Sequence, residues 1–402
     1  MKVLIISYAF PPDTNSQAQH VYGLYMSLSK YMDVDVITSA KSSKIYDNNI
    51  YYVPLGKLHN LSKNEPKTKT LNVTRKNNLA NILKKRLIPD TVIDWYPQVI
   101  KFYKNNISKE YDYIIGIATP YTDLLIANRI LKLSSKKDSK LILVYADPWA
   151  GELSVNKANL RKKFEELIEK KLLNKSNMVY MVTKNAMEYY KKIYPFLANK
   201  IEYYYLGHNF NPKKTDRRNF NNDIVTLSYF GTLQSVHRDP FCFFKTLDNE
   251  KYVGKLKVRL FLLPHISHTP IIEYISESQN LKNIVEINNA LPYKDMTEEV
   301  KNSDYNIIFG NSSKLQIPGK LFDYIGLKSR IFYLKKLPNE EIENILSNYG
   351  SIIVNNNELD IANALDKILQ KEEVFINEKI TQKLYRKECY KKIVNYISKR
   401  ND

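Results

Sequence analysis

Short apolar runs alternate with helix-length amphipathic segments along most of the chain. In the first half, the apolar runs predict buried strands at Val3–Ser7, Val34–Thr38, Tyr113–Ile117, Leu141–Tyr145 and Met178–Val182. Apolar residues at helical spacing predict helices between them, over His20–Lys30, Tyr121–Leu133 and Leu160–Asn174. This alternation is typical of parallel βαβ units.

The helix predicted over Leu160–Asn174 has a two-faced pattern. Four apolar residues fall on one face and mixed charges on the other: Phe164, Leu167, Ile168 and Leu172. The segment is therefore expected to form an amphipathic helix.

The alternation breaks between Asn209 and Asp223, where the chain is polar and carries no periodic apolar pattern. We interpret this stretch as a linker between domains. A second series of strands is predicted at Ile224–Phe230, Val258–Leu263, Ile284–Ile287, Asn306–Phe309, Ile331–Leu334 and Ser351–Val354. The sequence therefore predicts an α/β protein with two Rossmann-like, doubly wound domains. They would span residues 1–208 and 209–377, and a helical tail, 378–402, would pack back on the first domain.

Composition narrows the class of protein. The 402 residues can form two cores, and the apolar and charged fractions, 44% and 26%, are those of a soluble globular protein. Cys242 and Cys389 are the only cysteines, which favours the reducing cytosol. No apolar stretch is long enough to span a bilayer, and the opening apolar run is better explained as a buried strand than as a signal peptide.

The net charge of +19 indicates a nucleic acid, an anionic membrane or a phosphorylated substrate as partner, unless lysines simply cover the surface. Between Lys57 and Arg86 there are nine Lys or Arg residues and one acid, Glu65. Lys84, Lys85 and Arg86 lie among apolar residues at helical spacing. This stretch is predicted either to lie on anionic lipid or to be an ordinary surface helix.

The loops after parallel strands are the expected place for a ligand. Pro318 and Gly319 stand where a helix would begin, so its free amides would face the crevice and suit a diphosphate. Lys320 has the wrong charge for the first turn of a helix, which an anion nearby would explain; a surface lysine is the alternative. Asp323, about one turn further, is placed to bind ribose hydroxyls or is simply a favourable early-helix acid.

Several short motifs occur in an order found in one enzyme family. In the first half they are Phe10-Pro11-Pro12-Asp13, Arg86-Leu87-Ile88-Pro89-Asp90, Trp95, Tyr111-Asp112, Thr119-Pro120 and Asp147-Pro148-Trp149. In the second half they are Phe230-Gly231-Thr232-Leu233, Arg238-Asp239-Pro240 and Ile317-Pro318-Gly319-Lys320-Leu321-Phe322-Asp323-Tyr324. Over nearly its whole length the chain resembles a family 4 retaining glycosyltransferase of the GT-B fold, in the bacterial branch that builds surface polysaccharides such as capsule and lipopolysaccharide.

The chain departs from the family at several positions. Asn15 and Ser16 stand where paired glycines often approach the donor phosphates, and Thr232 replaces a frequent basic residue. Many members of the family have two spaced glutamates in the second domain; this chain has Leu315 at the earlier position and Asp323 at the later one. Ala146 stands where a His or Arg often precedes Asp147.

The resemblance implies two domains facing each other across a cleft, and sugar transfer from a nucleotide-sugar with retention. Arg238, Lys320 and the amide of Gly319 would stabilise the departing diphosphate. Donor contacts are further expected from Asn15, Ser16, Gly231, Thr232, Pro318 and Asp323. Asp147 would orient the acceptor or the transferred sugar, unless it serves only to start a helix.

The implied acceptor is a saccharide, expected to be lipid-linked, and the enzyme would rest on the inner face of the cell membrane. No metal or other cofactor is expected. His265 and His268 lack further ligands nearby, so zinc is not predicted. Two rival functions remain: a sugar-nucleotide 2-epimerase on the same architecture, and a nucleic-acid-binding protein, for which no motif accompanies the lysines.

Overall fold

The computed structural model describes residues 1–13, 15–40, 44–46, 49–56, 87–149, 159–211, 223–233, 238–263, 268–371 and 374–398. The chain divides into two compact units. Unit 1 comprises Met1–Tyr204 and Tyr390–Asp402, and unit 2 comprises Tyr205–Cys389. Within the predicted tail, residues 378–389 thus belong to unit 2 and the remainder to unit 1.

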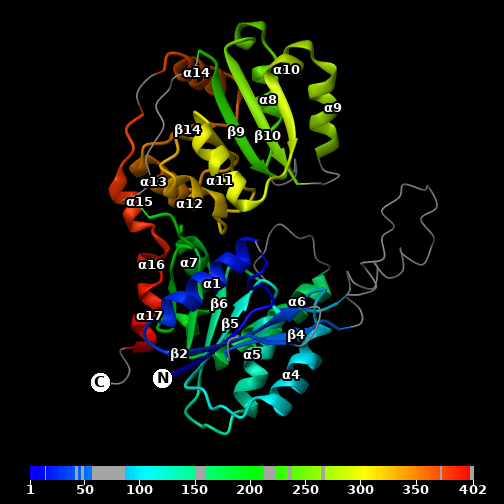
Figure 1. Cartoon of the computed structure of the whole chain (residues 1–402), viewed down its shortest axis with the longest axis vertical. Coiled ribbons are helices and arrows are strands. Elements are labelled where there is room, and N and C mark those ends of the chain that lie inside the picture. Colours follow the sequence, from blue (N-terminus) through cyan, green and yellow to red (C-terminus); the bar gives the residue numbers. More distant parts are fainter. Residues whose placement is uncertain are drawn as a thin grey trace, which may run out of the picture. The chain divides into compact units, whose positions relative to one another are not determined.

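Unit 1 is built on an eight-stranded sheet in the order β3-β4-β2-β1-β5-β6-β7-β8, parallel except for β3 (Figure 1). The strands are β1 (Lys2–Ile6), β2 (Asp33–Ala40), β3 (Lys44–Tyr46), β4 (Ile50–Pro54), β5 (Tyr113–Ala118), β6 (Lys140–Tyr145), β7 (Met178–Met181) and β8 (Ile201–Tyr203). The helices are α1 (Ser16–Leu28), α4 (Trp95–Asn106), α5 (Thr122–Leu133), α6 (Asn159–Lys175), α7 (Lys184–Ile193), the 3-10 turn η1 (Pro195–Leu197) and α17 (Lys391–Ser398).

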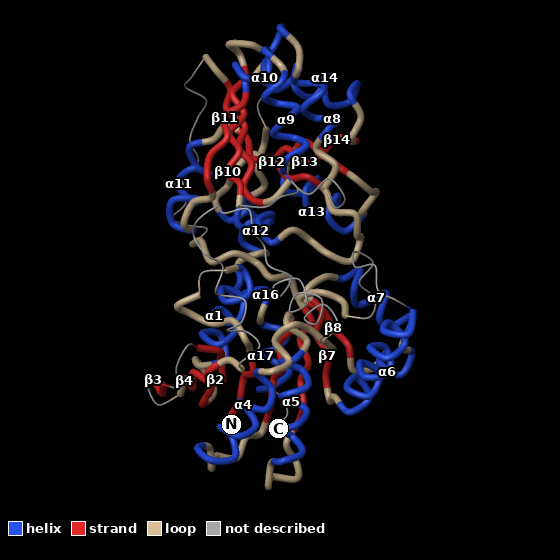
Figure 2. The backbone as a smooth tube through the Cα atoms, turned by 90° about the vertical axis from the view of Figure 1, so that its right-hand side faces the viewer, coloured by secondary structure: helices blue, strands red, loops and turns tan. Residues whose placement is uncertain are grey.

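Unit 2 has a six-stranded, fully parallel sheet in the order β11-β10-β9-β12-β13-β14. The strands are β9 (Val225–Gly231), β10 (Leu256–Leu262), β11 (Val285–Asn289), β12 (Tyr305–Phe309), β13 (Ile331–Lys335) and β14 (Ile352–Asn355). The helices, most of them labelled in Figure 2, are α8 (Phe241–Leu247), η2 (Glu250–Tyr252), α9 (Thr269–Glu277), α10 (Gln279–Ile284), α11 (Tyr293–Asn302), α12 (Gly319–Gly326), α13 (Glu340–Tyr349), α14 (Glu358–Leu369), α15 (Glu378–Lys383) and α16 (Arg386–Cys389).

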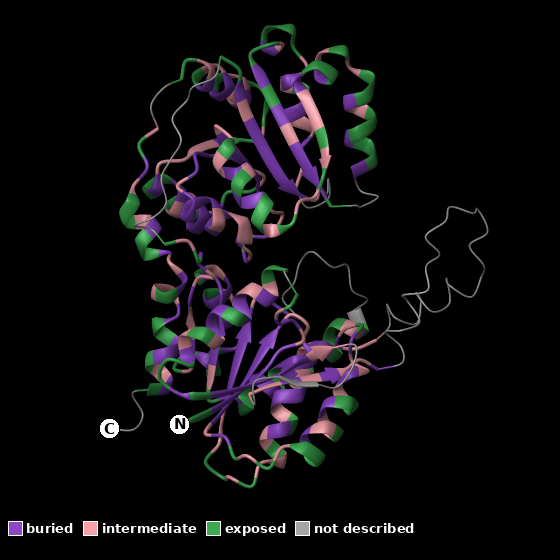
Figure 3. Cartoon of the chain, viewed as in Figure 1, coloured by how far each residue is buried: buried purple, intermediate pink, exposed green. Residues whose placement is uncertain are grey.

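Both sheets reverse their strand order in the middle, between β1 and β5 in unit 1 and between β9 and β12 in unit 2. This is the doubly wound arrangement, which leaves a ligand crevice beyond the carboxyl ends of the two central strands. The central strands are buried along nearly all of their length (Figure 3), because helices cover both faces of a parallel sheet. The two Rossmann-like domains predicted from the sequence are confirmed, as are all eleven predicted strands.

Helix α6 is present as predicted, but its burial differs from that of an ordinary amphipathic helix. Glu165 and Glu169 are completely buried, whereas Phe164 and Leu167 are exposed. The buried carboxylates have partners: Arg161 forms an ion pair with Glu165 at 2.7 Å, and two tyrosine hydroxyls donate to Glu169. Satisfied in this way, a carboxylate can occupy the interior.

Among the described residues, no helix has the length and apolar character that crossing a bilayer requires.

The segment that opens unit 2 is tied to the segment that closes it. His208 N donates to the carbonyl of Leu384 (3.0 Å), and Arg386 N donates to the carbonyl of His208 (2.8 Å). The buried His208 ring packs directly against α12, where a Cβ at Gly326 would lie 2.4 Å from its Cγ. Only glycine fits this helix position, so α12 has a fixed place in unit 2.

We predict that Gly326→Ala lowers the free energy of unfolding by about 2 kcal/mol, as expected for overpacking a rigid site. Gly254→Ala is the control, since its φ of +72° strains an L-residue but no atom lies within 4 Å of the new methyl. The control should lose only about 1 kcal/mol. Urea unfolding of both variants measures the difference, and equal losses would contradict the packing account.

Candidate functional site

The ammonium group of Lys320 lies beneath the carboxyl end of β9. Helix α12 begins at Gly319, directly after Pro318, and its first turn carries Lys320. The Nζ donates a hydrogen bond to the carbonyl oxygen of Phe230. A Cβ at Gly231 would lie 2.6 Å from this Nζ, and Gly231 has a φ of +135°. The backbone conformation therefore requires glycine there, and the lysine ammonium occupies the space that the missing side chain leaves.

Arg238 is fixed beside this lysine by three hydrogen bonds. Its Nε donates to Oδ1 of Asn311 (3.2 Å), and its Nη1 donates to the Tyr229 hydroxyl (3.0 Å) and to the Thr232 carbonyl (3.1 Å). The Tyr229 hydroxyl in turn donates to the same Thr232 carbonyl at 2.7 Å. Thr232 thus contributes through its backbone. Tyr229 and Asn311 hold the guanidinium at the switch point between β9 and β12.

Burial and charge shift the titration of this cluster. Burial, helped by the nearby Arg238 guanidinium, lowers the pKa of Lys320 to about 7. Burial raises the pKa of Asp323 to about 6, against the opposing effects of Arg386, the Tyr293 hydroxyl (3.0 Å) and Lys320. Two cations held together in a partly dehydrated place repel each other. An anion bound between them would relieve that repulsion.

The start of α12 adds a further attraction for anions. No side chain caps this end of the helix, and the first turn contains no acidic residue. The amides at Gly319 and the positive end of the helix dipole are therefore available to an anion beyond β9 and β12. The structure brings together Gly231, Arg238, Pro318, Gly319, Lys320 and Asp323, all of which were predicted from the sequence.

Three residues of this cluster were not predicted from the sequence: Tyr229, Asn311 and Tyr293. Tyr229 lies in the last three residues of β9 and Asn311 lies two residues after the end of β12, so their position near the switch point was a usable indication. Tyr293 comes from α11, and nothing in its local sequence points to Asp323. At the earlier glutamate position of the resembled family, Leu315 is buried and offers no charge.

The predicted residues of unit 1 lie beyond the carboxyl ends of other strands. Asn15 is the N-cap of α1, where its Oδ1 accepts from the amide of Ala18 at 2.8 Å, and Ser16 is the first residue of that helix. Asn15 and Ser16 are both exposed. Lys84, Lys85 and Arg86 lie outside the described residues.

Asp147 stands in a loop that is firmly anchored after β6. The Trp149 amide donates to the Tyr190 hydroxyl (2.9 Å), which donates to the buried Glu169 (2.6 Å). The Tyr121 hydroxyl donates to the Pro148 carbonyl at 2.8 Å, and its ring stacks on Trp149 with 5.0 Å between centroids. The half-buried Asp147 is therefore carried on a fixed backbone.

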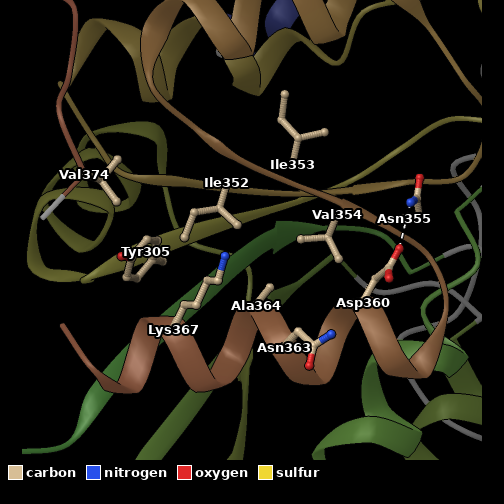
Figure 4. Close-up of a pocket in the computed structure, with 10 residues that line it drawn as sticks. All are labelled: Tyr305, Ile352, Ile353, Val354, Asn355, Asp360, Asn363, Ala364, Lys367 and Val374. Carbon is tan, nitrogen blue, oxygen red and sulfur yellow. Dashed lines mark hydrogen bonds between the residues drawn. The ribbon is translucent and has the colours of Figure 1, made fainter. Parts of the chain in front are cut away.

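The described residues contain no group of His, Cys, Asp and Glu side chains suited to a metal ion. A cavity of about 400 Å³ lies elsewhere in unit 2, between β14 and α14 (Figure 4). Asp360 there accepts from the Asn355 amide at 2.7 Å. This cavity includes none of the predicted site residues.

Comparisons with known proteins identify the fold. No protein-family profile and no curated protein matches the sequence. Among solved structures, the chain is similar to sucrose-phosphate synthase from Thermosynechococcus elongatus (12% identity, TM-score 0.67, 100% of this chain and 98% of that one). It is similar to the lipopolysaccharide outer core galactosyltransferase WaaB (12%, TM-score 0.62, 100% of both chains) and to a UDP-N-acetylglucosamine 2-epimerase (14%, TM-score 0.54, 100% and 97%).

The chain has the GT-B fold. At these identities the similarity establishes the fold, and the chemistry has to be argued from the residues.

We predict that Lys320→Met stabilises the fold by about 1 kcal/mol at pH 7, because it removes a buried charge and keeps the side-chain volume. The pKa of Lys320 is about 7 in the folded chain and 10.5 in its ordinary state, so the unfolded chain binds more protons between these values. The free energy of unfolding of the wild type therefore rises with pH in this range, because Lys320 loses its buried charge. The extra stability of Lys320→Met over wild type shrinks toward pH 10. Urea unfolding at pH 7 and 9.5 measures this; a variant less stable than wild type at pH 7 would refute the buried-charge account.

Proposed function

We propose that this protein is a retaining glycosyltransferase that moves a sugar from a nucleotide-sugar donor to a saccharide acceptor. The observation that carries the proposal is the pair of Arg238 and Lys320, held at the switch point of unit 2 beside the uncapped start of α12. The GT-B fold is consistent with this use of the site.

The donor diphosphate is the anion that this cluster suits best. In transfer, the bond between the anomeric carbon and the diphosphate breaks, and negative charge builds on the departing phosphate oxygens. Arg238, Lys320 and the amide at Gly319 are already fixed where they would stabilise that charge, so they need little rearrangement during the reaction. Asp323, one turn further along α12, would take the ribose hydroxyls. In a front-face mechanism the donor phosphate itself receives the acceptor proton, so no protein base is required.

Unit 1 would bind the acceptor. Its loop at Asp147 is fixed by Tyr121 and Tyr190, and Asp147 would orient the acceptor hydroxyl or the transferred sugar. Asn15 and Ser16 would contact the donor from the start of α1. We further propose that the acceptor is lipid-linked, in bacterial surface polysaccharide synthesis. The enzyme would then work on the inner face of the cell membrane, with Lys84, Lys85 and Arg86 near anionic lipid.

A sugar-nucleotide 2-epimerase is the second candidate, supported by the similarity to an epimerase of known structure. The two functions differ in their products. An epimerase converts the nucleotide-sugar without an acceptor, whereas a transferase releases nucleoside diphosphate only as a new glycoside forms. Product analysis with and without a saccharide acceptor distinguishes them.

We predict that Lys320→Ala and Arg238→Ala each slow sugar transfer by a factor on the order of 10², as expected when one charge-stabilising group is lost. The wild-type kcat/KM for the donor should fall above pH 7, because Lys320 then loses its proton, with a pKa of about 7. Lys320→Ala should lack this falling limb. The measurement is a steady-state assay between pH 6 and 9 under saturating acceptor.

Lys245→Ala is the matched control, since Lys245 is an exposed lysine of the same unit. It should retain wild-type rate and pH dependence. Rates within threefold of wild type for both site variants would place the diphosphate elsewhere.

We predict that Asp147→Asn keeps the affinity for nucleotide and lowers kcat, because Asn retains the shape of the side chain but not its charge. Calorimetric titration with nucleotide and steady-state turnover check the two effects separately. Loss of thermal stability with unchanged specific activity would instead assign Asp147 a structural role.

A further inference from the structure

The outward face of α6 carries an apolar stripe. Leu160, Phe164 and Leu167 are spaced i, i+4 and i+7, so they lie on one side of the helix. Their exposed fractions are 84%, 52% and 49%. Figure 2 shows α6 at the edge of unit 1. An aligned stripe of large apolar side chains facing solvent is uncommon on a helix and indicates an interaction surface.

The helix cannot rotate to hide this stripe. Its inner side is held by polar contacts, in which Arg161 pairs with Glu165 and the hydroxyls of Tyr190 and Tyr194 donate to Glu169 at 2.6 and 3.2 Å. Rotation would break these bonds and leave buried carboxylates without partners, which costs more than apolar exposure. The hydrogen bonds and the ion pair on the buried side of α6 therefore keep Phe164 and Leu167 exposed.

The stripe is flanked by positive charge. On the same side of α6 as the stripe, the exposed lysines are Lys163, Lys170, Lys171 and Lys175, whereas Lys162 lies on the opposite side. Two of the three acids of the helix, Glu165 and Glu169, are buried, so Glu166 is the only one near the surface. The positive region continues onto α5, where Lys175, then burial and then Arg129 lower the pKa of Lys132.

We propose that this face of α6, Leu160, Phe164 and Leu167 with the surrounding lysines, is a contact surface for an anionic lipid bilayer. A helix lying parallel to the membrane places its apolar side chains among the acyl chains near the headgroups. Lysines beside the stripe keep their ammonium groups at the phosphate level, because their methylene stems can bend toward the surface. Nucleic acid would match the charge but would not bind leucine and phenylalanine, and an ordinary protein partner would not require so many lysines.

This surface is separate from the basic segment at Lys84–Arg86 and does not depend on the sugar-transfer reaction. If this surface binds lipid, part of the binding comes from apolar contacts, and that part should persist at moderate salt. Binding by surface lysines alone would be lost as salt screens them.

The test is flotation of the full-length chain with vesicles of phosphatidylcholine, alone or mixed with phosphatidylglycerol. Phe164→Ser with Leu167→Ser should weaken binding to the anionic vesicles on the order of tenfold, since burying the exposed half of each side chain is worth about threefold. The matched control replaces two exposed apolar residues of unit 2, Leu359 and Phe375, by Ser. The control should bind as wild type does.

A second readout reports the contact directly. Both native tryptophans, Trp95 and Trp149, are fully buried, so a tryptophan at position 164 reports its own surroundings. In Phe164→Trp, anionic vesicles should shift the emission to shorter wavelength, and lipids brominated near the headgroup should quench it. Unchanged emission on binding would overturn the proposal.

The remaining outcomes separate the rival explanations. If replacing Lys84, Lys85 and Arg86 by Gln abolishes binding while the Phe164/Leu167 variant binds normally, the membrane contact lies in that segment and the α6 proposal fails. If the wild type is a dimer and the Phe164/Leu167 variant is a monomer, the face binds a second copy of the chain instead.

Transfer to a short, water-soluble acceptor should be unchanged in the Phe164/Leu167 variant. Loss of this transfer would assign the face to the acceptor site instead. Failure of the transferase proposal would leave the vesicle results unaffected.

Discussion

The contact between the Lys320 ammonium and the end of β9 is the constraint on which the site depends. The backbone at position 231, next to the Phe230 carbonyl that accepts from this ammonium, has a φ of +135° and so favours glycine. The contact also requires α12 to start directly beyond the sheet, so Gly326 must allow this helix to pack against the His208 ring. Arg238 adds a second cation, held by Tyr229 and Asn311. The result is a positive, partly dehydrated cluster beyond β9, which is the basis for proposing that an anion binds there.

Buried carboxylates have a structural function in unit 1. Asp35 accepts from the Tyr111 hydroxyl (2.5 Å) and Lys109 (3.0 Å), and Glu169 accepts from Tyr190 and Tyr194. The hydrogen bonds from Tyr190 and Tyr194 to Glu169 fix both a loop and a helix. Through Tyr190 they position the loop of Asp147, and through Glu169 they fix the rotation of α6, leaving Phe164 and Leu167 outside. The same hydrogen bonds thus connect the proposed acceptor side with the proposed membrane face.

The sequence predicted the strands well because those of a doubly wound sheet are short, continuous apolar runs. It also located the start of α12, since proline and glycine there leave no cap. Three of the described strands escaped prediction because they are short or only partly apolar: Lys44–Tyr46, Ile50–Pro54 and Ile201–Tyr203. Leu172 of the predicted apolar face of α6 is buried as expected, but the exposure of Phe164 and Leu167 was not predicted. The burial of Glu169 could not be predicted either, because its partners are tyrosines distant in sequence. For the same reason, Tyr293 was not connected with Asp323.

Binding of nucleotides to the wild-type chain tests the central claim most directly. Thermal unfolding would be followed with UDP, GDP, ADP, CMP and dTDP, each added in excess to wild type and to a variant with Arg238 replaced by Ala. The account predicts that at least one nucleoside diphosphate raises the wild-type melting temperature, because a ligand bound only to the folded state stabilises it, and that the variant shows a much smaller rise. CMP, with a single phosphate, should have less effect. If no nucleoside diphosphate stabilises the wild type, or if the variant responds equally, the cluster of Lys320 and Arg238 is not a diphosphate site.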